Sequence, residues 1–238
     1  MCTSLNRNGE GPTAASPDAD QVGSFRHANA TLPILKILTC GDRAFLLELA
    51  GVDEVLQYHA SLQAADIAGV VDLVPAARTI LVQIDPAVTE LRVVLGAVEK
   101  LQIVPRQRRD ESPAVDIPIR YDGPDLTGLS ARLGVTPDEF IRRHSSQTWT
   151  VAFTGRTPGF GYLVGAGEPF DVPRRREPRP EVPTGAVAMA GRFTGIYPRP
   201  SPGGWQVIGT TEVQVWNVER TPPALLSPGQ QVRFIQED

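Results

Sequence analysis

Cysteine is scarce in this chain, and its scarcity excludes two common ways of stabilising a fold. The two cysteines, Cys2 and Cys40, offer neither a disulfide framework nor the spacing of metal ligands. The three histidines are scattered along the chain and add no zinc motif. We therefore expect no metal site, and a reduced, cytoplasmic setting is the simplest interpretation.

Further absences narrow the range of functions. No apolar run approaches the roughly 18 residues that a membrane-spanning helix needs, and the first residues lack the pattern of a secretory signal. The net charge of −4 argues against nucleic acid or an anionic membrane as the main partner. The GxGxxG and Walker A fingerprints and the GxSxG nucleophile elbow are absent too. We therefore expect neither a nucleic-acid partner nor a membrane partner, and the sequence indicates no nucleotide site.

Composition divides the chain into three segments. Residues 1–29 are rich in Asn, Gly, Ser, Pro and Ala and have no apolar period, which is typical of a disordered tail. A charged, proline-bearing stretch at 104–114 predicts a boundary between two folded domains. We therefore expect an N-terminal domain at 30–112 and a second domain at 113–238.

The first domain alternates between two apolar periods, which distinguish strands from helices. Short apolar runs predict strands at 34–38, 44–49, 70–74 and 79–84. Apolar spacings of three and four residues predict helices at 52–62 and up to 101, the second beginning at Asp85 and Pro86 as cap and first helical residue. The order ββαββα predicts an α+β domain with its helices on one face of an antiparallel sheet. His59 falls on the apolar face of the first helix, which indicates a structural histidine.

The second domain combines two short helices with many short strands. A strand is predicted at 115–119, followed by one helix capped by Asp125 and another that starts at a Thr136–Glu139 capping box and ends at His144. Beyond Trp149, apolar runs such as 149–153, 213–216 and 232–235 alternate with Gly and Pro. This pattern favours a small β-barrel or sandwich.

The stretch 183–209 is the most unusual part of this domain. Apolar runs at 186–190 and 205–208 predict strands, and the glycines and prolines between them predict a shaped loop rather than a helix or an ordinary strand. One interpretation makes it a binding loop that presents Tyr197 and Trp205, and the other makes it a barrel crossover whose aromatics fill the core. His144 has two interpretations as well, as a proton-transfer group or as a cation at a helix C-terminus.

Arginines gather just before this stretch. Arg174, Arg175, Arg176 and Arg179 stand among prolines and have the paired donors that clamp a carboxylate or a phosphate. The nearby acids Glu177 and Glu181 support the alternative of a solvated strand edge. From the residues alone, the domain is a β-barrel with aromatic and arginine side chains available for binding.

Several motifs together resemble one family. They are PGFGYL (158–163), PRRREPRPEVPTGAVAMAG (173–191), TGIYP (194–198) and SPGGWQVIGTT (201–211), with GDRAFLLEL (41–49), VVDLVPAARTILVQIDP (70–86) and VDIPIRYDGPDL (115–126) from the first half. The chain resembles allophanate hydrolase subunit 1, also called the KipI family or the B subunit of 5-oxoprolinase. The resemblance covers about residues 32–236.

The resemblance implies a fold, a partner and a reaction. It implies a cyclophilin-like β-barrel as the C-terminal domain, and a partner that is either allophanate hydrolase subunit 2 or a protein like the C subunit of 5-oxoprolinase. It also implies ATP-dependent hydrolysis of an amide or lactam, 5-oxoproline or allophanate, by the complex of the two chains. ATP would be used by the complex, and no cofactor is assigned to this chain itself. Two alternatives are a regulatory protein that inhibits a histidine kinase, as in the KipI branch, and a peptide-binding module without catalysis.

The resemblance also implies site residues. His144 and Tyr197 are the expected catalytic residues. The expected substrate-binding residues, including two arginines from the clamp hypothesis, are Pro158, Gly159, Phe160, Tyr162, Arg174, Arg175, Pro183, Thr194, Gly203, Gly204 and Trp205. Two positions depart from the family pattern: Arg156 replaces a common aromatic residue, and Phe193 replaces a common glutamine.

Overall fold

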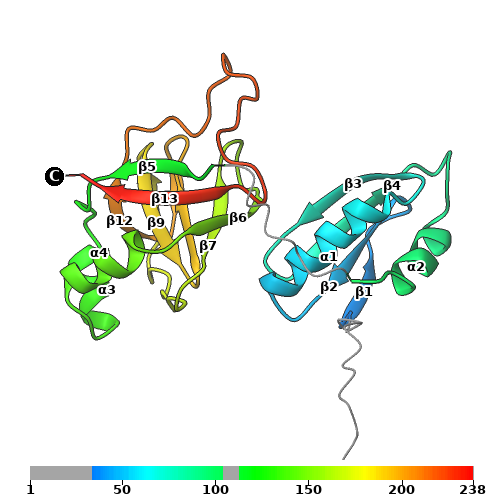
Figure 1. Cartoon of the computed structure of the whole chain (residues 1–238), viewed down its shortest axis with the longest axis horizontal. Helices are drawn as coiled ribbons and strands as arrows, with labels where there is room; N and C mark the ends of the chain where they lie inside the picture. Colours follow the sequence, from blue (N-terminus) through cyan, green and yellow to red (C-terminus); the bar gives the residue numbers. More distant parts are fainter. Residues whose placement is uncertain (1–33, 104–112, 238) are drawn as a thin grey trace, which may run out of the picture. The chain divides into compact units, whose positions relative to one another are not determined.

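The computed structural model describes residues 34–103 and 113–237 (Figure 1). The predicted tail at 1–29 lies outside these residues, as does nearly all of the predicted boundary at 104–114. Within the described ranges, no helix has the length and apolar character required to cross a bilayer.

The first described range has the predicted order of elements. They are β1 (Lys36–Thr39), β2 (Ala44–Glu48), α1 (Val52–Ala65), β3 (Val70–Pro75), β4 (Thr79–Ile84) and α2 (Leu91–Glu99). The strands form one antiparallel sheet in the order β1-β2-β4-β3. Phe45 and Val82 from the central strands share one core with Tyr58 of α1 and Val94 of α2. Both helices therefore cover the same face of the sheet, and the predicted ββαββα arrangement is confirmed (Figure 1).

The predicted start of the second helix is wrong. Asp85 opens a turn instead, because its carboxylate accepts the amide of Ala87 at 2.9 Å and its carbonyl accepts the amide of Val88 at 3.0 Å. The helix begins six residues later, at Leu91. An Asp-Pro pair is a signal for both structures, since the side chain of Asp can bond to its own backbone two residues on.

The second described range forms a β-barrel with two helices. Its elements are β5 (Val115–Ile119), α3 (Leu126–Arg132), α4 (Pro137–Ser145), β6 (Trp149–Thr154), β7 (Gly161–Gly165), β8 (Arg179–Val182), β9 (Ala186–Ala190), β10 (Phe193–Ile196), β11 (Ser201–Gly203), β12 (Gln206–Thr210) and β13 (Gln231–Gln236). Seven strands make one sheet in the order β12-β9-β10-β7-β6-β13-β5. The two edge strands meet where Arg120 and Thr210 exchange backbone hydrogen bonds of 2.9 Å. This bridge nearly closes the sheet into the expected barrel.

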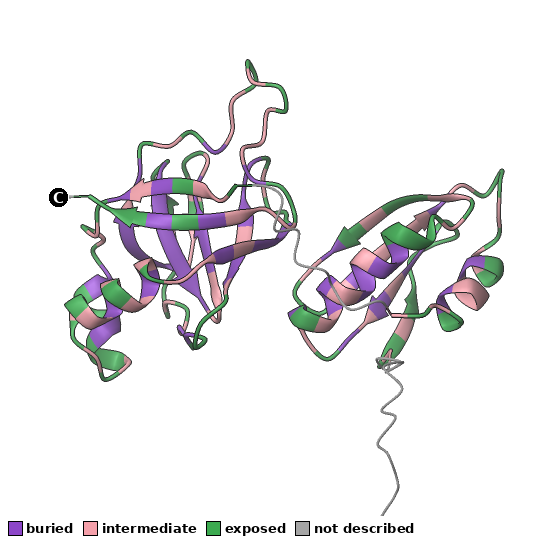
Figure 2. Cartoon of the chain, viewed as in Figure 1, coloured by how far each residue is buried: buried purple, intermediate pink, exposed green. Residues whose placement is uncertain are grey.

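The core of the barrel is built from buried side chains of its strands and helices. Val151 of β6, Leu163 of β7 and Ile196 of β10 are completely buried, and the buried bands of these strands stand out in Figure 2. Phe140 of α4 and Leu129 of α3 belong to the same cluster. The two helices therefore belong to this core, as the sequence predicted for Phe140.

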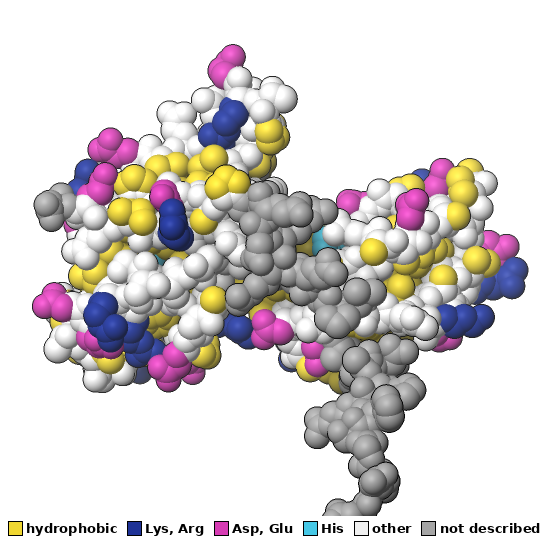
Figure 3. All heavy atoms as spheres, in the orientation of Figure 1, with side chains coloured by type: hydrophobic (Ala, Val, Ile, Leu, Met, Phe, Trp, Pro, Cys, Tyr) yellow, Lys and Arg dark blue, Asp and Glu magenta, His cyan; other side chains and the backbone are white. Residues whose placement is uncertain are grey.

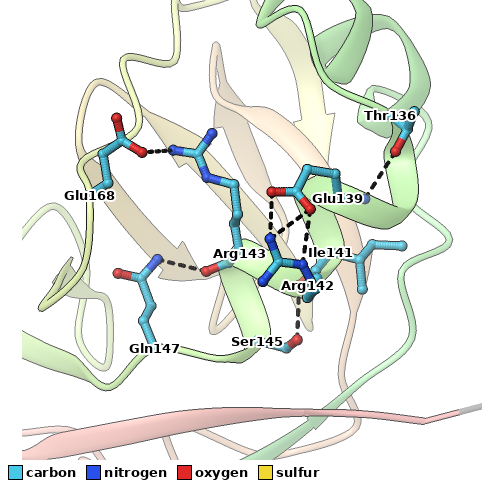
Figure 4. Close-up of polar contacts among 8 residues, drawn as sticks. All are labelled: Thr136, Glu139, Ile141, Arg142, Arg143, Ser145, Gln147 and Glu168. Carbon is cyan, nitrogen blue, oxygen red and sulfur yellow. Dashed lines mark hydrogen bonds and ion pairs between the residues drawn. The ribbon is translucent and has the colours of Figure 1, made fainter.

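Thr136 caps α4 as predicted, which is the first half of the predicted capping box, whereas the carboxylate of Glu139 binds Arg142. The hydroxyl of Thr136 accepts the amide of Glu139 at 3.2 Å, and Pro137 is the first helical residue. Glu139 binds Arg142 in a fork of 2.7–2.9 Å, and Arg143 reaches Glu168 at 3.1 Å (Figure 4). Both arginines of this helix are thus paired with acids.

Two predictions in the C-terminal half are wrong. The stretch between β9 and β12 holds two further strands, β10 and β11, where a loop was expected. Gly195 serves β10 by leaving room for Phe160, since a Cβ there would lie 2.8 Å from its ring. The predicted strand at 213–216 forms only an isolated bridge between Trp216 and Ala224.

Charges on the surface are mixed. On the face drawn in Figure 3, acidic and basic side chains are interspersed rather than gathered in one region of a single sign.

Candidate functional site

Four of the predicted site residues form one aromatic cluster. Phe160, Tyr162, Tyr197 and Trp205 meet in edge-to-face pairs with ring centroids 5.0–5.5 Å apart. They come from the start of β7, the end of β10 and the start of β12. Phe160, Tyr197 and Trp205 are at most 5% exposed, so three of the four fill a core. This supports the crossover interpretation for their rings and leaves the polar tip of Tyr197 to be considered separately.

The hydroxyl of Tyr197 lies against a glycine. A Cβ at Gly203 would stand 2.3 Å from this oxygen, so only glycine leaves room for it. Among the described residues, the Tyr197 hydroxyl has no hydrogen-bond partner. Thr157 Oγ1 is the only fully buried side-chain polar atom of these residues without a partner, so the Tyr197 hydroxyl is not fully buried. Tyr197 therefore brings an unpaired donor to the edge of the aromatic cluster.

Asp125, which the sequence predicts to be a helix cap, binds two arginines instead. Its carboxylate accepts Arg175 at 2.6 Å and Arg179 at 2.8 and 2.9 Å, and it also accepts the amide of Val207 at 2.7 Å. Its side chain makes no capping hydrogen bond to α3. Burial alone would raise the pKa of Asp125, but the hydrogen bonds of Arg179 and Val207 and the charges of both arginines lower it.

This carboxylate fixes the arginine-rich segment beside the barrel. Arg175 also donates its amide to the carbonyl of Gly204 at 2.8 Å, and Gln206 donates to the carbonyl of Pro173 at 3.0 Å. Arg175, one of the predicted substrate-binding residues, thus already has an internal carboxylate partner. Arg174 differs, because it is exposed and has no ion pair or hydrogen bond among the described residues. Sequence reasoning missed the role of Asp125 because helix capping already explained an Asp at that position.

Arg156 lies over the aromatic cluster. Its backbone has a φ of 63°, in the left-handed region that residues other than glycine rarely adopt. Its guanidinium carbon is 5.0 Å from the ring centre of Tyr197 and 5.6 Å from that of Phe160. It donates to the hydroxyl of Ser201 at 2.9 Å and to the carbonyl of Pro202. Burial raises the pKa of Tyr197, whereas the charges of Arg156, Arg174 and Arg179 act to lower it.

The predicted catalytic residue His144 is completely buried. Its Nδ1 lies 2.8 Å from the hydroxyl of Tyr121 and its Nε2 lies 3.0 Å from the hydroxyl of Thr194. Burial lowers the pKa of His144 to about 3, so the ring is neutral at neutral pH. A neutral, buried ring does not fit the interpretation as a cation at a helix end. His144 and Thr194 are both completely buried in this structure, so neither side chain has a surface that a substrate could contact.

The remaining predicted residues surround the cluster in different ways. Pro158 and Pro183 are exposed, and Gly204 is half-buried beside Arg175. Gly159 has a φ of 83° and packs against Trp216, where a Cβ would approach to 2.6 Å. No group of three or more potential metal ligands occurs among the described residues.

Comparison with known proteins identifies relatives over most of the chain. Residues 35–226 match the family described as carboxyltransferase domain, subdomain C and D. The B subunit of 5-oxoprolinase from Escherichia coli O157:H7 is 37% identical over 178 residues, which are 72% of this chain and 80% of that protein.

Solved structures share the fold. The crystal structure of TTHA0988 has a TM-score of 0.67 and 38% identity over 82% of this chain, which spans only 40% of the length of TTHA0988. The urea carboxylase of Kluyveromyces lactis has a TM-score of 0.64 at 17% identity, over 87% of this chain and 23% of that enzyme.

Proposed function

The chain belongs to the family described as carboxyltransferase domain, subdomain C and D, and from this premise we propose that it is one component of an enzyme complex of the 5-oxoprolinase or allophanate hydrolase type. The observation that carries the proposal is the 37% identity with the 5-oxoprolinase B subunit of Escherichia coli O157:H7, which extends over 80% of that protein. The reaction is the ATP-dependent hydrolysis of a lactam or amide bond. For 5-oxoproline, water adds to the ring carbonyl and the ring C–N bond breaks, giving glutamate, while ATP is cleaved to ADP and phosphate.

The complex needs a second chain. The chain covers 40% of TTHA0988, so that more than half of that longer protein lies outside the match. The name of the relative from Escherichia coli, a B subunit, supports a partner chain, which we propose to be of the allophanate hydrolase subunit 2 type or the 5-oxoprolinase C-subunit type. In addition, this chain lacks the nucleotide fingerprints of its own that ATP use would call for.

Within this chain, we assign substrate contact to the edge of the aromatic cluster. The hydroxyl of Tyr197 is the unpaired donor there, and of the three arginines whose charges act on it, Arg156 and Arg174 have no acid partner among the described residues. His144 and Thr194 would help to position Tyr197, because their hydrogen bond of 3.0 Å joins α4 to β10, the strand that directly precedes Tyr197. Arg175 would position the segment through Asp125 rather than contact substrate.

Reconstitution tests the proposal. The chain is co-expressed with a protein of the 5-oxoprolinase C-subunit type, and ATP hydrolysis and product formation are measured with 5-oxoproline, allophanate and urea in parallel. We expect a stable complex whose ATP hydrolysis depends on one lactam or amide substrate and on both chains. A complex that forms but releases neither ADP nor product with any of the three substrates would refute the proposed reaction.

The alternative functions gain no support from these comparisons. The relative from Escherichia coli has the name of an enzyme component, and no observation on the described residues favours a kinase inhibitor or a peptide-binding module. If the chain does not bind its candidate partner and elutes as a monomer in size-exclusion chromatography, that result would favour the peptide-binding module.

A further inference from the structure

Two arginines near Tyr197, Arg156 and Arg174, have no acid partner among the described residues, in contrast to Arg175 and Arg179. Arg175 and Arg179 share the carboxylate of Asp125. Arg156 donates only to neutral oxygens, those of Ser201 and Pro202. Arg174 has neither an ion pair nor a hydrogen bond among the described residues. The cluster therefore carries two positive charges in excess.

The position of these charges is set by the fold. Arg156 is fixed by its two hydrogen bonds and by the rings of Tyr197 and Phe160, in spite of the left-handed backbone that costs free energy at a residue other than glycine. Arg175, the residue after Arg174, holds this segment in place through its hydrogen bonds to Asp125 and Gly204. The entropic cost of binding a ligand here is thus reduced, because the Arg156 side chain and the segment that carries Arg174 are already ordered.

A neutral donor completes the arrangement. The hydroxyl of Tyr197 is unpaired, and the charged groups that act on it are Arg156, Arg174 and Arg179, with no carboxylate among them. Guanidinium groups and a phenol hydroxyl are donors that match the oxygens of a carboxylate. An acid in the place of the ligand would satisfy all three.

We propose that Arg156 and Arg174, together with the hydroxyl of Tyr197, form a binding site for the carboxylate group of a small molecule. In the proposed reaction, this group is the carboxylate of 5-oxoproline, which stays unchanged while the lactam opens. The identification of that ligand rests on the proposed function, whereas the site itself rests on the charges and contacts of this chain. Arg156 and Arg174 are then specificity residues, which select acids over their neutral amides.

Binding to the full chain tests the site directly. Affinities for 5-oxoproline, its neutral amide and succinate are measured by calorimetry at pH 7 and low salt. The variants are Arg174→Gln, Arg156→Gln and, as a matched control, Arg176→Gln, which removes the same charge from an exposed residue two positions away that does not act on Tyr197. We expect the dissociation constants of the acids to rise tenfold or more in the first two variants and to stay within twofold in the control. We expect the amide to bind the unmodified chain at least tenfold more weakly than the acid.

The outcomes separate the site from the reaction. If succinate binds through Arg174 but 5-oxoproline neither binds nor is hydrolysed by the complex, the carboxylate site stands and the proposed reaction falls. If the complex hydrolyses 5-oxoproline and Arg174→Gln leaves both its KM and the affinity of the chain unchanged, the carboxylate site is overturned while the reaction stands. Failure of the unmodified chain to bind any carboxylate saturably also overturns the site. Because Arg174 is exposed and unpaired, its variant is expected to fold normally.

Discussion

Acidification should destabilise this protein through one buried histidine. His144 has a pKa of about 3 in the folded chain, against an ordinary value of 6.5, because burial disfavours the charged ring. As the pH falls below 6.5, the unfolded chain takes up a proton that the folded chain refuses. The stabilisation is therefore complete above pH 6.5 and is lost progressively as the pH falls toward 3.

The size of the effect follows from the two pKa values. Between pH 7 and pH 5, the unfolded histidine gains about three-quarters of a proton and the folded one gains almost none. Integration over this interval gives a loss of about 2 kcal/mol in the free energy of unfolding. His59 adds to the loss in the same direction, since burial lowers its pKa too, so the contribution of His144 has to be isolated with a variant.

Denaturant unfolding at the two pH values, with and without His144, provides the assay. His144→Gln keeps hydrogen-bonding groups near Tyr121 and Thr194 and removes the titration. We expect the variant to be less stable at pH 7, by about 1–3 kcal/mol, because the ring contacts with Phe140, Trp149 and Phe234 are lost. Its loss between pH 7 and pH 5 should be about 2 kcal/mol smaller than that of the unmodified chain. Equal losses in both proteins would refute the argument and indicate a histidine that titrates normally, and proton resonances of the ring would decide the matter if the variant does not fold.

Three further predictions follow from single contacts. Gly203→Ala should cost about 1–3 kcal/mol of stability, since its Cβ would lie 2.3 Å from the Tyr197 hydroxyl. In a double-mutant cycle, the same substitution should cost less in a Tyr197→Phe background, and equal costs in both backgrounds would contradict this explanation. Asp125→Asn should lower stability at pH 7 by about 2 kcal/mol in thermal unfolding, because Arg175 and Arg179 lose their partner. Since the pKa of Asp125 is lowered on folding, the deficit should shrink as the pH falls through the acid range, and a constant deficit would argue against the ion pairs. Thr136→Ala should cost about 1 kcal/mol through loss of the α4 cap, measured by urea unfolding, with Thr136→Ser as a control that keeps the cap.

Local patterns predicted the secondary structure where one period dominated. The buried positions of β4, such as Val82, alternate strictly, those of β2 alternate from Phe45 onward, and the α1 residues Val55, Tyr58 and Leu62 recur at helical spacing. The helix cap at Thr136 formed because its signal involves only four neighbouring residues. Where two structures share a signal, the prediction failed: Asp85 and Pro86 suit a turn as well as a helix start.

Partners far apart in the sequence were beyond these patterns. β13 pairs in parallel with β5, with Val232 opposite Val115, and no local period specifies that register. Gly195 and the nearby prolines suggested a loop, yet β10 is a central strand because the missing side chain makes room for Phe160. The four aromatic residues of the cluster were named as site residues through their motifs, whereas their packing against one another depends on contacts between β7, β10 and β12.

The role of Asp125 illustrates how a local explanation can hide a distant one. An Asp directly before a helix is explained by capping, so nothing in the sequence called for partners 50 and 54 residues away. Once those partners are known, the four arginines of the segment are no longer equivalent, because two of them lie against the carboxylate of Asp125 and Arg174 does not. A sequence pattern can thus predict that arginines gather in one segment of the chain. Which of them have no acid partner, and so can pair with an anionic ligand, depends on which acids the fold brings to them. Here that acid is Asp125, at the start of α3.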